Sequence, residues 1–158
     1  MTTQEQLNIY AAYLPYQLHC ELKDEVGTYE ITHLNICEVQ CDGVNTIEIH
    51  IVPLTHIKPI LYDLSHLTKE IEHEGRVFTP IDVFEITDDH DSYSVEYDHG
   101  NIKLIRGLKA ISESSSYYDI QFLPFEVVQR LISWHFNVFG IPAGDFIDKA
   151  TIKTESND

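Results

Sequence analysis

The pattern of apolar positions changes within the first thirty residues from helical to alternating. Thr2 and Glu5 stand at the spacing of a capping box, and apolar residues then recur every three or four positions until Pro15. After Pro15, apolar and polar residues alternate as far as Lys23. We therefore expect a helix of about three turns, then a half-buried strand, and then a turn at residues 24–27.

Two further stretches have the β-branched, alternating pattern of strands. A strand of mixed quality covers residues 28–40, and a turn signal follows at residues 41–43. A second strand begins at Ile47, and Pro53 ends it or confines it to a sheet edge. These two strands are predicted to form a hairpin.

The central part of the chain alternates between helical and extended patterns. Residues 58–74 place apolar side chains three and four positions apart, which predicts one or two short helices that stop at Gly75. A short extended piece follows, and Pro80 can open another helical turn. Residues 93–106 have the pattern of a second hairpin, and residues 118–122 have that of one more strand.

The strongest helical pattern comes near the end of the chain. It begins at Pro124, a favourable first helical position, and Gly140 stands where a helix commonly ends. Two apolar stripes cover most of its circumference, so we expect the helix to be the spine of the core, or to bury its second stripe in a partner. The stripes consist of Phe125, Val128, Ile132, Phe136 and Phe139, and of Val127, Leu131, Trp134 and Val138.

These elements predict the fold class α+β. We expect a single compact domain over residues 1–150, in which a long C-terminal helix and shorter helices pack on an antiparallel sheet of four to six strands. Residues 151–158 are predicted to be a polar tail. The chain of 158 residues, of which 43% are hydrophobic, is long enough for a packed core.

Composition limits the class of protein further. No apolar run approaches the roughly 20 residues that span a bilayer, and the first residues lack the pattern of a secretory signal. Cys20, Cys37 and Cys41 leave an odd thiol under any pairing, which favours a reducing compartment. We therefore expect a cytoplasmic protein with no membrane partner.

The charge is strongly negative. Ten Lys and Arg against 26 Asp and Glu give a formal charge of −16, which disfavours direct binding of nucleic acid. No cation occurs between Arg76 and Lys103. This segment carries the acidic residues that we take as candidate contacts to a protein partner, together with Trp134 on the last helix: Asp82, Glu85, Asp88, Asp89, Asp91, Glu96 and Asp98.

Three short segments resemble a group of uncharacterised small proteins encoded by phages and prophages of Bacteroidetes. The matching residues are 12–16, 57–61 continued by 64–71, and 134–140. The resemblance implies a viral or mobile-element origin, a single domain and the cytoplasm of a bacterial host. It implies no activity and no functional residue.

Two clusters could bind a metal. His90 and His99 with Asp89 and Asp98 have the side chains of a divalent-ion site that activates water. Turn-forming residues in a loop would explain the same sequence without a metal. The second set is His33, Cys20, Cys37 and Cys41, which has zinc-binding chemistry. The predicted strand would hold its members too far apart, so we expect buried cysteines there and no cofactor.

A third set could provide acid and base groups, but its members are equally ordinary loop and helix-start residues. It consists of His50, His56, Asp63 and His66. Residues 112–116 offer serine hydroxyls without a positioned base, and the motifs of the common nucleotide-binding and hydrolytic enzymes are absent.

The sequence therefore leaves enzymatic activity open and favours a role in binding. We expect an accessory protein of a phage or mobile element that binds a protein partner. One form of this role is an acidic decoy that inhibits a host or defence factor. The alternatives are a small metal-dependent hydrolase that uses the His/Asp cluster, and a minor virion or assembly component. A homo-oligomer is compatible with all three.

Overall fold

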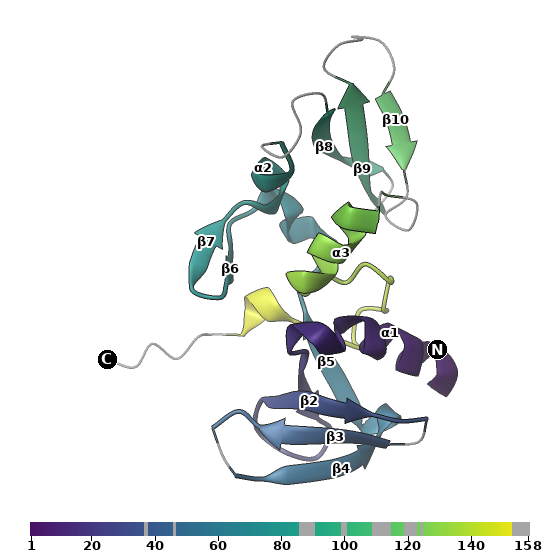
Figure 1. The fold of residues 1–158 in the computed structure, drawn as a ribbon, viewed down its shortest axis with the longest axis vertical. Coiled ribbons are helices and arrows are strands. Elements are labelled where there is room, and N and C mark those ends of the chain that lie inside the picture. Colours follow the sequence, from purple (N-terminus) through teal and green to yellow (C-terminus); the bar gives the residue numbers. More distant parts are fainter. Residues whose placement is uncertain are drawn as a thin grey trace. The chain divides into compact units, whose positions relative to one another are not determined.

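The chain forms two compact units in a computed structural model (Figure 1). The structure describes residues 1–36, 38–45, 47–85, 91–98, 101–108, 115–118, 123 and 125–152, with the backbone alone for 84, 85, 91–98, 101–108 and 115–118. Unit 1 comprises Met1–Tyr62 and His135–Asp158, and unit 2 comprises Asp63–Trp134. The α+β content agrees with the predicted class, while the single domain over residues 1–150 stays a prediction.

Unit 1 is built on a six-stranded sheet with the order β11-β5-β1-β2-β3-β4. All neighbours are antiparallel except β11 and β5, which run parallel. A mixed sheet of six strands thus takes the place of the antiparallel sheet that was predicted. The strands are β1 (His19–Leu22), β2 (Tyr29–Leu34), β3 (Glu38–Gly43), β4 (Ile49–Pro53), β5 (Ile57–Leu61) and β11 (Ile147–Asp148).

One face of this sheet is covered by α1 (Thr3–Tyr13), which lies beside β2 (Figure 1). The predicted capping box is confirmed, because the Thr2 hydroxyl accepts from the Glu5 amide and the Glu5 carboxylate accepts from the Thr2 amide. Tyr10 and Tyr13 are fully buried. The short 3-10 helices η1 (Leu14–Tyr16), η2 (Leu54–His56) and η5 (Lys149–Thr151) complete the unit.

The hairpin predicted in the first half of the chain is confirmed as the antiparallel pairing of β3 with β4, but the extent of its first strand was wrong. Residues 28–40 do not form one strand, because β2 ends at Leu34 and β3 begins at Glu38. Cys41 lies inside β3, where it pairs with His50 of β4. The turn was therefore predicted too early in the chain, because residues 41–43 belong to β3.

The helices predicted over residues 58–74 were also largely wrong. Ile57–Leu61 form β5, and only Leu64–Thr68 are helical, as the 3-10 helix η3. Four of the five residues of β5 are buried, and a short, continuously apolar run has no period that distinguishes a buried strand from a helix. Pro59 is tolerated there because it pairs with Cys20 at a position where the ladder with β1 needs no amide hydrogen.

Unit 2 contains two separate small sheets. β6 (Ile71–His73) and β7 (Arg76–Phe78) form a hairpin, and β8 (Asp91–Asp98), β9 (Asn101–Leu108) and β10 (Ser115–Tyr118) form a three-stranded sheet in the order β10-β9-β8. The antiparallel pairing of β8 with β9 confirms the second predicted hairpin. The helix predicted at Pro80 is also confirmed as α2 (Pro80–Glu85).

The long C-terminal helix predicted over residues 124–140 was wrong in its length. α3 spans Phe125–Ser133. The amide of Trp134 still bonds to the Arg130 carbonyl, but His135 then takes a left-handed backbone with φ of 62°, a conformation that commonly ends helices. Members of both predicted stripes are buried, namely Ile132 and Phe136 of the first and Val127 and Leu131 of the second, whereas Phe125 is 75% exposed.

Candidate functional site

The β6–β7 hairpin of unit 2 forms one side of an open pocket. Its turn consists of Glu74 and Gly75, with φ of 50° and 72°. Positive φ at both central residues gives the turn that best matches the twist of two antiparallel strands. His73 and Arg76 are paired at the end of the ladder. The imidazole and the guanidinium therefore come from directly opposite residues of the two strands.

The pocket has a volume of about 580 Å³ and is lined by aromatic, aliphatic and charged side chains. Trp134, directly after α3, lies with its ring centroid 4.9 Å from that of Phe78, and the two planes are inclined by 59°. Val77 and Val83 extend the apolar wall, and His73, Glu74 and Arg76 supply the polar lining. A concave apolar site with a few polar groups is the usual form of a ligand or anchor pocket.

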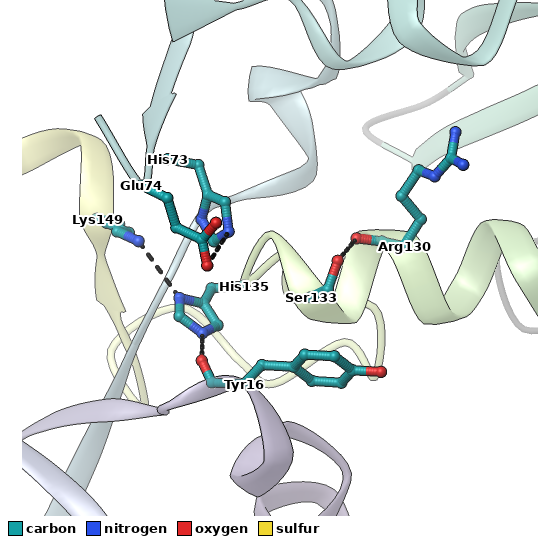
Figure 2. Close-up of polar contacts among 7 residues, drawn as sticks. All are labelled: Tyr16, His73, Glu74, Arg130, Ser133, His135 and Lys149. Carbon is teal, nitrogen blue, oxygen red and sulfur yellow. Dashed lines mark hydrogen bonds and ion pairs between the residues drawn. The ribbon is translucent and has the colours of Figure 1, made fainter. Parts of the chain in front are cut away.

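The polar groups of the pocket differ in exposure. His73 Nε2 lies 3.9 Å from Glu74 Oε1, and the His73 side chain is largely buried whereas that of Glu74 is exposed (Figure 2). Arg76 is also exposed. A separation of 3.9 Å is too long for a hydrogen bond, so this pair is a weak contact and not an aligned acid–base couple.

No activated nucleophile lines the described pocket. Two hydroxyl residues adjoin the lining in sequence: Thr79 follows Phe78, and Ser133 precedes Trp134. The Ser133 hydroxyl donates to the Arg130 carbonyl at 2.8 Å (Figure 2). The pocket walls therefore offer apolar contact and two opposite charges at an exposed rim. This combination suits recognition of a side chain better than covalent chemistry.

Unit 1 contains a separate polar cluster around His135 (Figure 2). Its Nε2 lies 2.6 Å from the Tyr16 carbonyl oxygen, and its Nδ1 lies 3.3 Å from Lys149 Nζ. A carbonyl only accepts, so Nε2 carries the hydrogen, and Nδ1 accepts from the ammonium group. Lys149 also lies 5.1 Å from the centroid of the Tyr62 ring. Both ring nitrogens are thus engaged, and we interpret the cluster as structural.

His19 lies beside this cluster, with its ring centroid 6.5 Å from that of His135. Burial lowers the pKa of His19, Lys149 lowers it further, and Glu30 opposes the effect. The imidazole is thereby kept neutral at lower pH than a free histidine.

The structure places the predicted acidic contacts only in part. Asp82 is exposed in the first turn of α2. Glu85 ends α2, and Asp91, Glu96 and Asp98 belong to β8. Asp88 and Asp89 lie outside the described residues. Trp134 is the one predicted contact that the structure shows to line a pocket.

The predicted metal clusters are not assembled in the described part of the chain. His90, His99 and Asp89 lie outside it, and Asp98 is at the opposite end of β8 from Asp91, which puts these two backbone positions about 23 Å apart. Within the described residues, no group of three or more His, Cys, Asp or Glu could hold a metal ion.

The cysteines of the second set lie in the core. Cys20 and Cys41 are fully buried with their sulfurs 3.7 Å apart, whereas His33 is exposed on β2, and Cys37 lies outside the described residues. The contact with Cys41 and burial both raise the pKa of Cys20. Such thiols behave as small apolar side chains.

The third set has ordinary structural roles. His50 Nδ1 lies 3.2 Å from Glu25, and its ring packs on Tyr29. His56 is exposed. Asp63 caps η3 by accepting from the Ser65 amide, and His66 lies within that short helix.

Four residues of the pocket, His73, Glu74, Arg76 and Phe78, were not predicted as site residues. The available signal was the Glu74-Gly75 pair between the short segments 71–73 and 76–78, which is compatible with a tight hairpin turn. It was overlooked because the preceding residues were assigned to a helix that stopped at Gly75.

Comparisons with protein-family models, with curated proteins and with solved structures found no match. Among the described residues, no helix is both long and apolar enough to cross a membrane.

Proposed function

We propose that the chain is an accessory protein of a phage or mobile element and acts by binding a protein partner. The observation that carries the proposal is the pocket of unit 2, in which Trp134 and Phe78 form an aromatic wall beside the exposed Glu74 and Arg76. Tryptophan and arginine are among the residues that dominate binding energy in protein interfaces.

The partner that fits this pocket presents an apolar side chain flanked by basic residues. The apolar side chain would enter between Trp134, Phe78 and Val77. Basic flanks are favoured because the chain carries a formal charge of −16 and has no cation between Arg76 and Lys103. Such a field accelerates the approach of a basic surface and disfavours an acidic one. An acidic decoy for a host or defence factor would work in this way.

The test is a pulldown with the full tagged chain from a lysate of a bacterial host, with bound proteins identified by mass spectrometry. The decisive variant is Val77→Lys, which places a cation on the 65% exposed pocket residue without disturbing a core. Val26→Lys is the matched control, because Val26 is fully exposed in unit 1.

We expect a partner that the wild type and Val26→Lys retain, that Val77→Lys loses, and that a wash with high salt releases, because exposed charges are screened within about 8 Å at physiological ionic strength. Equal retention by all three chains would contradict the proposal, as would retention of no protein above background.

A further inference from the structure

β4 is an open edge of the sheet in unit 1, since it is the last strand in the order β11-β5-β1-β2-β3-β4. The Gly43 amide bonds to the Glu48 carbonyl, and Cys41 pairs with His50 two residues further along. Bonded pairs alternate along an antiparallel ladder. The amide and carbonyl groups of Ile49 and Ile51 therefore point away from β3, toward the open side.

The side chains along this edge are apolar and exposed. Ile47 is 101% exposed, Ile49 64% and Ile51 66%. Soluble proteins usually protect an open edge with charged side chains, a bulge or proline. β4 has Pro53 at its end only, and the irregularity in the sheet lies in the β2–β3 pairing, between Ile31 and His33.

The edge also carries little charge. Between Asp42 and Lys58 the only acidic or basic residue other than histidine is Glu48. Two copies of a chain with a formal charge of −16 repel one another over most of their surfaces. The low charge near β4 keeps this repulsion small where the two copies meet there, and it offers a basic partner little charge complementarity.

We propose that two copies of the chain pair through their β4 edges, antiparallel and around a two-fold axis at His50. In this register Ile49 of each copy faces Ile51 of the other, and the outward amide and carbonyl groups of these residues satisfy one another. Ile47 faces Pro53, whose missing amide hydrogen leaves only a carbonyl to accept. The edge is self-complementary, as a two-fold interface requires, and the isoleucines of both copies lie on one face of a continuous sheet.

The first test is the mass of the full chain in solution by sedimentation velocity over a range of concentrations. The wild type is expected to give twice the chain mass of 18.2 kDa. Ile51→Lys introduces two lysines into the dimer, one opposite Ile49 of each copy. The substitution should raise the dissociation constant by roughly tenfold or more. Asn8→Lys places a lysine at an exposed site on α1, outside the β4 edge, and should leave the dimer intact.

The second test fixes the register. In a Cys37→Ser/Cys41→Ala background, which removes the thiol that pairs with position 50 in the same copy, His50→Cys places two sulfurs opposite one another on the two-fold axis. We expect a covalent dimer on mild oxidation. Asn8→Cys, at an exposed site on α1, should stay monomeric on denaturing gels in the same background. The inference is overturned by a monomeric wild type, by any other stoichiometry, by a dimer that Ile51→Lys leaves unchanged, or by equal cross-linking at both positions.

Discussion

The Nε2 atom of His135 lies 2.6 Å from the carbonyl oxygen of Tyr16, across 119 positions of sequence. This bond ties the segment after α3 to the 3-10 helix η1 within unit 1. His135 is 5% exposed, and its backbone carbonyl also accepts from the Tyr62 amide at 2.7 Å. The residue therefore connects three parts of the unit.

Substitution of this histidine should destabilise the fold. His135→Ala removes the donor to Tyr16 and the acceptor for Lys149. Leaving buried polar groups without partners costs about 1–3 kcal/mol, so we expect the free energy of unfolding in urea to fall by that amount. His33→Ala, at an exposed site on β2, should change it by less than about 0.5 kcal/mol. Equal effects of the two substitutions would refute the structural role of His135.

Cys20 and Cys41 should resist oxidation to a disulfide although their sulfurs are 3.7 Å apart. They lie on β1 and β3, which flank β2, so their Cα atoms are separated by about two strand spacings, or 9–10 Å. A disulfide needs Cα atoms within about 7 Å. In a Cys37→Ser chain treated with diamide, we expect both thiols to react with maleimide after unfolding. A loss of two hydrogens from the intact mass would show that the backbone moves to allow the bond.

His19 should make the fold less stable in mild acid. Burial, followed by the charge of Lys149, lowers its pKa from the ordinary value of 6.5. The unfolded chain then takes up the proton first as the pH falls, so the contribution of the neutral imidazole is complete above about pH 6.5 and is lost below it.

The check is urea unfolding at several pH values for the wild type, His19→Gln and His33→Gln. His19→Gln should reduce the loss of stability below about pH 6.5 by at most about 1.4 kcal/mol per pH unit. His33 is exposed and serves as the matched control. A pH profile of His19→Gln that coincides with the wild type would show that His19 is not the responsible group.

Local signals in the sequence predicted those elements that are determined by local interactions. The capping box at Thr2 and Glu5, the helix at Pro80 and the β8–β9 hairpin depend on residues close together in the chain, and all three are present. The errors arose where distant contacts decide. β5 is a strand because β1 and β11 bond to both its edges, which no local period records.

The length of the last helix depended on one backbone conformation. Apolar spacing continues through Phe136 and Phe139, but His135 turns left-handed and makes its contacts to Tyr16 and Lys149. Asn137 then exchanges two hydrogen bonds with the backbone of Ile141. These tertiary contacts outweigh the apolar periodicity, and the chain leaves the helical conformation after Trp134.

The candidate site was predicted only through Trp134. The other pocket residues come from a hairpin of two three-residue strands, which is too short to give an alternating pattern. The acidic segment between Arg76 and Lys103 was evident from composition. Composition alone does not say where its side chains lie.

The most direct test of the proposed binding role uses Trp134 itself, because it is the only tryptophan of the chain and it lines the pocket. The emission of the full chain would be followed while a short peptide of leucine flanked by arginines is added. The account predicts a saturable change in emission that weakens with salt and with Val77→Lys, and no change for the peptide with glutamate in place of arginine. An emission that stays constant up to about 1 mM peptide, where binding would contribute about 4 kcal/mol, or that responds equally to both peptides, would contradict it.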